Sequence, residues 1–164
     1  MTTKQQIIER EKLSEYLLEG FKRMDFDLYQ ISFEPRSIVT RAHFTDMYIS
    51  PPEYYNPLGS SHLGLDVALR IVSQSLIAWY CNKARKPKKE LGEFIGKSLQ
   101  LEAKRPLDPR QDIICRIDIG AEKLSKYGLF CKLNFGLDGI SSLDNKFYTD
   151  SFKGSGELIF PLSE

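Results

Sequence analysis

The sequence predicts an α+β protein in which a curved antiparallel sheet wraps around one long central helix. Residues 61–84 contain no proline and are apolar on nearly every side, which indicates a helix buried over most of its circumference. Two segments of alternating apolar and polar residues precede this helix, and three or four more follow it. Strands and helices do not alternate along the chain, so the order disfavours a parallel sheet.

The first part of the chain predicts one helix, two strands and a loop. Residues 3–23 place apolar side chains at helical spacing between charges, which predicts an amphipathic helix on the outside of the domain. Residues 28–34 and 38–46 alternate, and the break Pro35-Arg36-Ser37 predicts a turn that joins two neighbouring strands. Residues 49–61 hold three prolines and a glycine, so they are predicted to form a loop.

The central helix is predicted to be capped by Ser60 or Ser61 and to end near residue 84. A basic run, 82–90, comes at this end of the helix. It is interpreted either as a solvated helix end whose cations complement the helix dipole, or as a docking patch. Such a patch would bind the phosphates of coenzyme A or an acidic carrier protein.

The second half of the chain predicts further strands and one loop. The strands are expected near residues 96–104, 112–119, 127–136 and 156–162. Within 112–119 the alternation is clear, with one apolar face made by Ile113, Cys115, Ile117 and Ile119. The polar segment 137–153 is predicted to be a loop.

Length and composition suit a single domain over residues 1–164, with 41% hydrophobic and 27% charged residues. The formal net charge of +1 supplies no global field, so neither nucleic acid nor a membrane surface is an expected partner. No apolar run approaches the roughly 20 residues that span a bilayer, so membrane insertion is not expected. The N-terminus is polar and has no signal-peptide core, which makes the cytoplasm the expected location.

Three widely spaced cysteines, Cys81, Cys115 and Cys131, form neither a C-x-x-C pair nor a metal-ligand spacing. Their odd number excludes complete pairing within the chain, and the expectation is buried, reduced thiols. No metal or organic cofactor is indicated by the sequence.

The polar residues of the central helix follow steps of three and four, which puts them on one stripe. The stripe consists of His62, Asp66, Arg70, Ser73 and Gln74. A polar stripe on a buried helix meets solvent, another subunit or a reaction site, and the sequence leaves these three readings open.

An ordered series of short segments carries a resemblance to a known family. The series is Phe44-Thr45, the tyrosine-bearing loop, Ser61-His62, Ser73-Gln74-Ser75-Leu76, Lys104 to Pro109, Cys115-Arg116 and Glu157-Leu158. In this order the chain resembles the hotdog-fold superfamily, and within it the branch of FcoT-type long-chain fatty acyl-CoA thioesterases. The resemblance spans about residues 10–162.

The resemblance implies a homodimer or higher homo-oligomer, with an acyl pocket between the central helix and the neighbouring subunit. It also implies acyl-CoA or acyl carrier protein thioesters as substrates. The polar site residues of the branch are a loop tyrosine, two helix asparagines and an early tyrosine. By position these fall on Tyr55, Gly64, Ser73 and Phe21 of this sequence.

Thioester hydrolysis requires a polarised carbonyl oxygen, an oriented or activated water and a held acyl chain. The amino end of the central helix offers backbone N–H groups for the oxygen, and Gly64 would let a thioester approach them closely. Tyr55 could donate a hydrogen bond to the same oxygen. Ser73 or Gln74 could orient water, and Asp66 could deprotonate it. His62, at the helix start, is a further catalytic candidate.

Three alternatives remain open at this stage. Members of the branch are implicated in adding glycine to an enoyl thioester, which would need Arg70 or Arg41 to bind the glycine carboxylate. Hydration or dehydration would pair a histidine, His62 or His43, with a carboxylate such as Asp66. A non-catalytic acyl-binding subunit would retain the shell of the fold alone.

Overall fold

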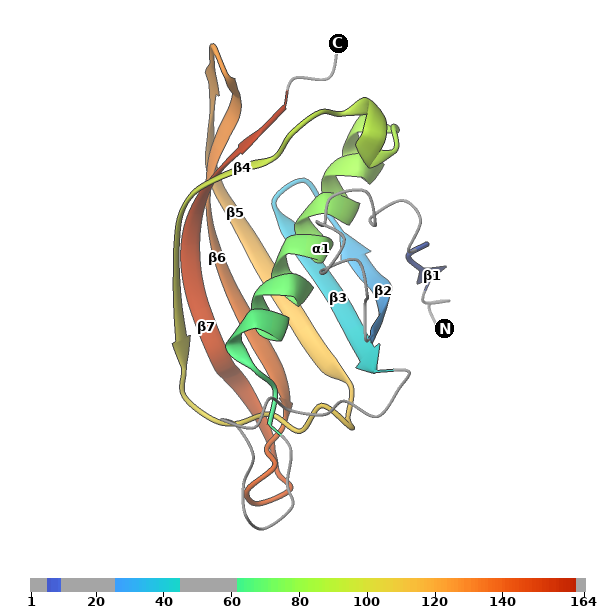
Figure 1. Cartoon of the computed structure of the whole chain (residues 1–164), viewed down its shortest axis with the longest axis vertical. Coiled ribbons are helices and arrows are strands. Elements are labelled where there is room, and N and C mark those ends of the chain that lie inside the picture. The colour runs from blue at the N-terminus through green and yellow to red at the C-terminus, as the bar shows by residue number, and fades with distance from the viewer. Residues whose placement is uncertain (1–5, 10–25, 45–61, 162–164) are drawn as a thin grey trace.

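The computed structural model describes residues 6–9, 26–44 and 62–161 of the chain. In this part of the chain, strands form one antiparallel seven-stranded sheet with the order β1-β2-β3-β5-β6-β7-β4 (Figure 1). The strands are β1 (Gln6–Ile7), β2 (Phe26–Phe33), β3 (Ser37–Phe44), β4 (Ile95–Ala103), β5 (Ile113–Ser125), β6 (Gly128–Ile140) and β7 (Phe147–Phe160). The described helices are α1 (Leu65–Ala84) and a short 3-10 helix, η5 (Lys88–Glu90). The prediction of an antiparallel α+β fold is confirmed.

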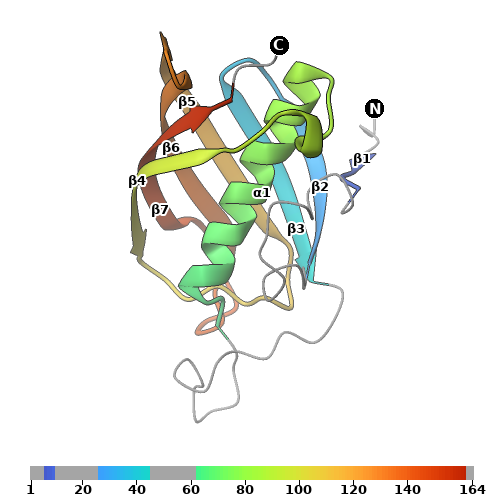
Figure 2. The ribbon, with the colours of Figure 1, turned by 45° about the horizontal axis from the view of Figure 1, so that its top comes forward.

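The sheet curves around α1, which lies along its inner face (Figures 1 and 2). Two contacts tie the helix to the β2–β3 hairpin. The hydroxyl oxygens of Thr40 and Ser75 lie 2.7 Å apart in the core, and Trp79 Nε1 donates to the carbonyl of Glu34 at 2.8 Å. The buried face of the helix and the inner face of the sheet therefore share one hydrophobic core.

The alternation predicted for 112–119 is confirmed in β5. Ile113, Cys115 and Ile117 are fully buried and Ile119 is nearly so, whereas Asp118 is exposed. The prediction of reduced cysteines also holds, because all three thiols are free and buried. Burial raises the pKa of the Cys115 thiol to about 12 and that of Cys131 to about 11, so both thiols stay protonated at neutral pH.

The loop predicted over 137–153 is wrong. Strand β6 continues to Ile140 and β7 begins at Phe147, which leaves only the turn 141–146 between them. Acidic residues caused the error, because Asp138 and Asp150 in these strands are paired with Arg116 across the sheet. A polar segment reads as a loop when its cross-strand partner cannot be seen in the sequence.

The predicted N-terminal helix is wrong where the structure describes it. Gln6 and Ile7 form β1, which pairs antiparallel with β2, and Ile8 N–H donates to the carbonyl of Leu28 at 2.8 Å. The open edge of β2 provides hydrogen-bond partners that outweigh a helical pattern of side chains. The remaining residues of the predicted span 3–23 lie outside the described part of the chain.

The central helix begins later than predicted. Gly64 occupies the N-cap position and supplies no side-chain cap, while Leu63 N–H donates to the carbonyl of Leu107 at 3.0 Å. This bond holds the residues before Gly64 against the 104–112 segment, so the helix cannot extend back to Ser61. The proposed caps Ser60 and Ser61 lie outside the described residues, and the N-cap position belongs to Gly64 instead.

The helix ends at Ala84, as predicted. The lysines of the basic run 82–90 lie in different surroundings. Lys83 pairs with Glu122 at 3.2 Å, while Lys88 is buried and donates to the carbonyl of Gly92. Two of the lysines are therefore already bound within the fold. Among the described residues, no helix is long and apolar enough to cross a membrane.

Candidate functional site

An open, mainly apolar groove of about 430 Å³ runs between α1 and β4. Its walls come from the helix, from β4 with the residue before it, and from the inner faces of β6 and β7. The lining residues are Leu69, Val72, Ser73, Leu76, Ile77, Phe94, Gly96, Lys97, Ser98, Leu99, Leu133 and Leu158. The volume lies within the range of small-molecule binding sites, and the aliphatic walls suit a hydrocarbon chain.

Two other hollows are of similar size but differ in chemistry. One of about 530 Å³ lies over the sheet between β4 and β5, and its Arg116 and Lys153 are already paired with carboxylates. The other, of about 520 Å³, lies between β1, β2 and the carboxyl end of α1. The groove beside β4 is the one whose lining is mostly aliphatic, so we take it as the candidate site.

Ser73 is the predicted site residue that reaches this groove. Its side chain is exposed on the helix face that also carries Leu69 and Leu76. Asp66 lies two turns earlier on the same face, about 10 Å toward the amino end of the helix. The Asp66 side chain is 56% exposed, so its carboxylate is in contact with solvent.

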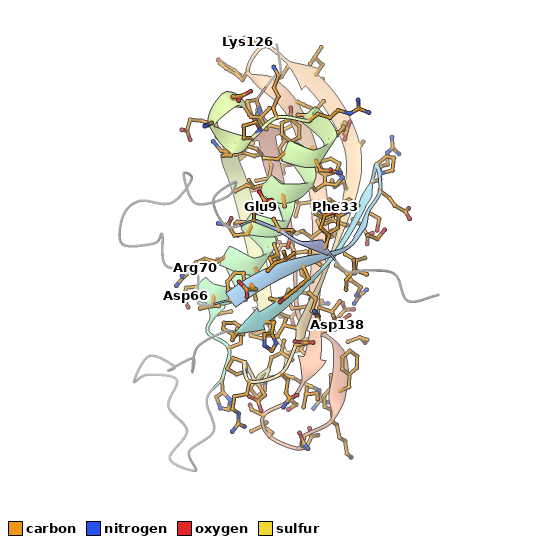
Figure 3. All side chains as sticks on the ribbon, turned by 90° about the vertical axis from the view of Figure 1, so that its right-hand side faces the viewer. Glu9, Phe33, Asp66, Arg70, Lys126 and Asp138 are labelled. Atoms are coloured by element: carbon orange, nitrogen blue, oxygen red, sulfur yellow. The ribbon has the colours of Figure 1, made fainter. Side chains whose placement is uncertain are left out.

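Arg70 is bound to Asp66 on the helix itself. Its Nη2 lies 3.5 Å from Asp66 Oδ2, in the i,i+4 arrangement, and both side chains lie at the amino end of α1 (Figure 3). The structural pairing that the spacing suggests is therefore formed. The guanidinium next to Asp66 also supplies a positive charge close to the start of the helix.

Gln74 does not share the groove with Ser73. It is 1% exposed, and successive helix positions are about 100° apart, which turns its side chain away from the groove. In the part of the chain that the structure describes, neither amide atom of Gln74 has a hydrogen-bond partner. The polar stripe predicted from spacing is thus divided between two sides of the helix.

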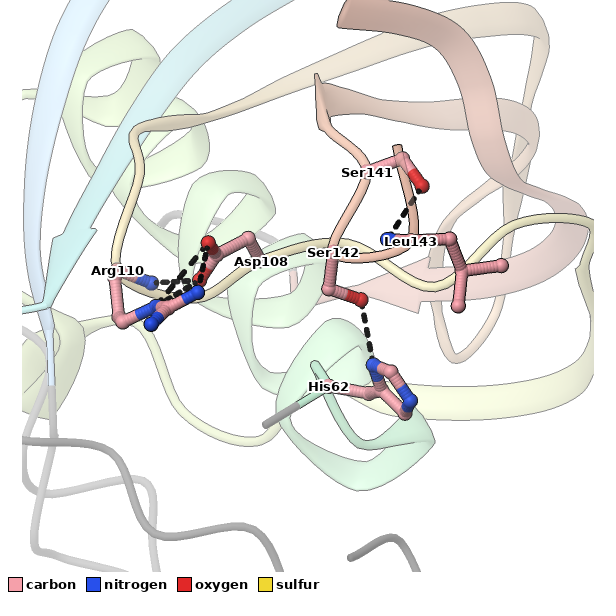
Figure 4. Close-up of polar contacts among 6 residues, drawn as sticks. All are labelled: His62, Asp108, Arg110, Ser141, Ser142 and Leu143. Carbon is pink, nitrogen blue, oxygen red and sulfur yellow. Dashed lines mark hydrogen bonds and ion pairs between the residues drawn. The ribbon is translucent and has the colours of Figure 1, made fainter. Parts of the chain in front are cut away.

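His62 lies just before α1 and contacts a turn that sequence reasoning missed. Its Nδ1 is 2.6 Å from the hydroxyl oxygen of Ser142, which belongs to the 141–146 turn between β6 and β7 (Figure 4). Both side chains are half-buried. Ser142 fell within the segment predicted as a loop, and no local pattern marks it, because the pairing depends on two residues far apart in sequence.

Asp108 adds a buried carboxylate to the same region (Figure 4). Burial by itself raises the pKa of Asp108, but hydrogen bonds and charge from Arg110, with a smaller contribution from His62, bring the pKa below its ordinary value. Asp108 therefore carries a negative charge at neutral pH, close enough to His62 to interact with it electrostatically.

His43 and Arg41 face away from the groove. Thr40 and Ala42 of β3 are buried against the helix, so the alternate residues point to the outer side of the sheet. There His43 Nδ1 lies 2.8 Å from Asp112, and Arg41 donates to the same carboxylate at 3.0 Å. These two residues are therefore not neighbours of Ser73 or of the amino end of α1.

The last predicted site residues are Gly64 and Tyr55. Gly64 is buried at the amino end of α1, where as the N-cap residue it has no side chain to bond to the first-turn N–H groups. Tyr55 lies outside the described residues. Within the described ranges, no three His, Cys, Asp or Glu side chains come together as a potential metal site.

Comparison with solved structures places this fold among known ones. The chain superposes on a protein of the thioesterase superfamily with a TM-score of 0.53 and 13% identity, covering 92% of this chain and 96% of that one. A thioesterase family protein from Silicibacter pomeroyi gives a TM-score of 0.51 at 7% identity, covering 82% and 85% of the two chains. No protein-family model matches the sequence, and no curated protein matches it significantly. The chain has the hotdog fold of these thioesterase-superfamily structures.

Proposed function

We propose that this protein hydrolyses a fatty acyl thioester of coenzyme A or of an acyl carrier protein. The observation that carries the proposal is an aliphatic groove along α1, a helix whose N-cap residue is the glycine Gly64. From Leu69 to Ile77 the helix wall of this groove is about 12 Å long. A hydrocarbon chain would lie along the groove, with its thioester at the amino end of α1.

The chemistry of the amino end supports hydrolysis there. Backbone N–H groups of the first helical turn have no intrahelical partner, and they can donate to the oxyanion that forms on the thioester. Gly64, the N-cap residue, adds no side chain of its own at this end of the helix. Asp66, exposed in the first turn of α1, supplies a carboxylate that can accept a proton from water.

The resemblance to FcoT-type thioesterases supports the finer assignment to long-chain acyl substrates. The position of Ser73 in the groove agrees with this assignment, because a small hydroxyl leaves space for the chain. Glycine addition is less favoured by the geometry. Arg41 lies on the other side of the sheet bound to Asp112, and Arg70 is paired with Asp66.

The test is release of free thiol from saturated and α,β-unsaturated acyl-CoAs of several chain lengths. We expect wild-type protein to release thiol, with the Ser73→Phe variant losing the longer substrates most, because the ring fills the groove. Losing the burial of part of the acyl chain corresponds to a fall of roughly tenfold or more in kcat/KM. Leu124→Phe provides the control, since Leu124 is 68% exposed and lies on the β5–β6 hairpin, away from the groove.

A different result would redirect the assignment. Absence of thiol release from every acyl-CoA, repeated with an acyl carrier protein thioester, would contradict the proposal. Consumption of the unsaturated substrate with glycine or water, detected as a new adduct by mass spectrometry, would move the assignment to addition.

We further propose that two copies of the chain pair through β4. Within the described sheet β4 pairs only with β7, and eight of its nine residues are exposed. Ile95 and Leu99 are about half exposed, at 50% and 49%. An exposed strand edge with apolar side chains is a ready template for pairing with another chain.

Analytical ultracentrifugation tests this pairing. We expect a dimer or higher oligomer for wild type and a shift toward monomer for Ile95→Lys, because an inserted lysine disfavours edge pairing. Leu124→Lys is the matched control, since Leu124 is 68% exposed at the tip of the β5–β6 hairpin. A monomeric wild type, or an equal effect of the two substitutions, would count against pairing through β4.

A further inference from the structure

We propose that Ser142 is a nucleophile activated by His62, and that the acyl group is transferred to the Ser142 hydroxyl oxygen before water releases it. This inference rests on the proposed thioester hydrolysis and names the route by which it proceeds. The route differs from direct attack by water on the thioester, in which Asp66 would act as the base.

Ser142 and His62 lie as a nucleophile and its base would. A nucleophilic serine needs its hydroxyl within hydrogen-bonding distance of a base, at about 2.6–3.2 Å. Ser142 Oγ and His62 Nδ1 are 2.6 Å apart, and both residues are half-buried rather than enclosed in the core (Figure 4). The pair is therefore close enough for proton transfer and open enough for a substrate to reach it.

Backbone hydrogen bonds hold the segments that carry His62 and Ser142 in place. Leu63 N–H donates to the carbonyl of Leu107 at 3.0 Å, next to His62. Ser142 N–H donates to the carbonyl of Pro106 at 3.2 Å, and Asp108 N–H donates to that of Ile140 at 2.8 Å. The 106–108 segment thus joins the start of α1 to the 141–146 turn, which fixes the nucleophile against its base.

The first turn of α1 and Asp108 supply groups that could stabilise the charges formed during the reaction. His62 is three residues before Leu65, so the first-turn N–H groups lie within about 11 Å of it along the chain. In the proposed route these groups would donate to the oxyanion that forms when Ser142 attacks. The carboxylate of Asp108, which interacts electrostatically with His62, would stabilise the imidazolium that forms on proton transfer.

In this route the acyl group passes from the thiol to Ser142 and then to water. The hydroxyl proton of Ser142 passes to His62 as the oxygen bonds to the thioester carbonyl carbon. The carbon–sulfur bond breaks, and the proton moves from His62 to the thiolate, which leaves as a free thiol. Water then attacks the acyl ester on Ser142, with His62 accepting its proton and returning it to the serine oxygen, so that a carboxylic acid is released.

The experiment is labelling with an alkyl fluorophosphonate, read by intact mass and peptide mapping, together with an acid quench during acyl-CoA turnover. We expect a single adduct on Ser142 in the wild type and none on it in Ser142→Ala. In His62→Gln, whose amide can still bond to the hydroxyl, we expect labelling to slow by about 10²-fold or more. Ser141→Ala is the matched control, because its hydroxyl accepts from Leu143 N–H in the same turn and does not contact His62.

Each result decides between the routes. An unlabelled wild type, a label on another residue, or undiminished thiol release by folded Ser142→Ala would overturn the inference while leaving thioester hydrolysis in place. Labelling of Ser142 without hydrolysis of any thioester would contradict the proposed function but support Ser142 as a nucleophile. If Ser142→Ala does not fold, the labelling rates of wild type and His62→Gln decide, since both retain the serine.

Discussion

The Gly154→Ala variant is expected to lose about 3 kcal/mol or more of its free energy of unfolding. A Cβ added at Gly154 would lie 2.1 Å from the backbone oxygen of Gln100 and 2.4 Å from the Phe135 ring. Neither neighbour can yield easily, because the oxygen belongs to the adjoining strand β4 and the ring is 5% exposed in the core. Urea denaturation followed by circular dichroism would measure the loss.

Gly96→Ala is the matched control for this prediction. It lies in β4, and its added Cβ would approach only Leu158, at 3.9 Å, which is an ordinary contact. We expect its stability to change by less than about 0.5 kcal/mol. For a chain of this size, 3 kcal/mol corresponds to a fall of roughly 6–12 °C in melting temperature. Equal melting temperatures for the two variants would show that β7 and β4 do not approach as closely as described.

The Arg116→Ala variant is expected to lose about 2–4 kcal/mol. Arg116 forms a bidentate pair with Asp138 at 2.7 and 2.8 Å, and its Nη2 also bonds to Asp150 at 2.8 Å. The side chain of Asp138 is only 7% exposed, so removing the guanidinium leaves a buried carboxylate without its cation. The loss stays below that of a fully buried pair, because Arg116 is 42% exposed. Chemical denaturation at pH 7 measures it.

Lys153→Ala provides the comparison on the same face of the sheet. Lys153 pairs with Glu102 at 3.6 Å, and both side chains are largely exposed, at 46% and 62%. Solvent screens such a pair, so we expect a loss of less than about 0.5 kcal/mol. A similar small loss for Arg116→Ala would mean that water already reaches Asp138 and that the cluster does not hold β5, β6 and β7 together.

Several elements could be predicted from the sequence because their patterns are local. The apolar circumference of residues 61–84 predicted α1, and the alternation of 112–119 predicted which face of β5 is buried. The reduced state of the cysteines followed from their number and spacing. These features depend on neighbouring residues along one helix or one strand, so a single sequence contains the information.

Other features depended on partners distant in the chain. Residues 137–153 look like a loop until Arg116 pairs with Asp138 and Asp150 across two strands. Gln6 and Ile7 follow a helical pattern, yet the free edge of β2 draws them into the sheet. In both places a long-range partner outweighs the local preference, which one sequence cannot reveal.

The candidate site shows the same division. The sequence by itself determined that α1 carries polar residues and predicted that Gly64 lies near its amino end. Only the tertiary structure separated Ser73, in the groove, from the buried Gln74, and only it brought Ser142 to His62 from 80 positions away. Helical spacing sets the direction in which a side chain points from the helix axis. The strand or turn opposite sets which groups that side chain contacts.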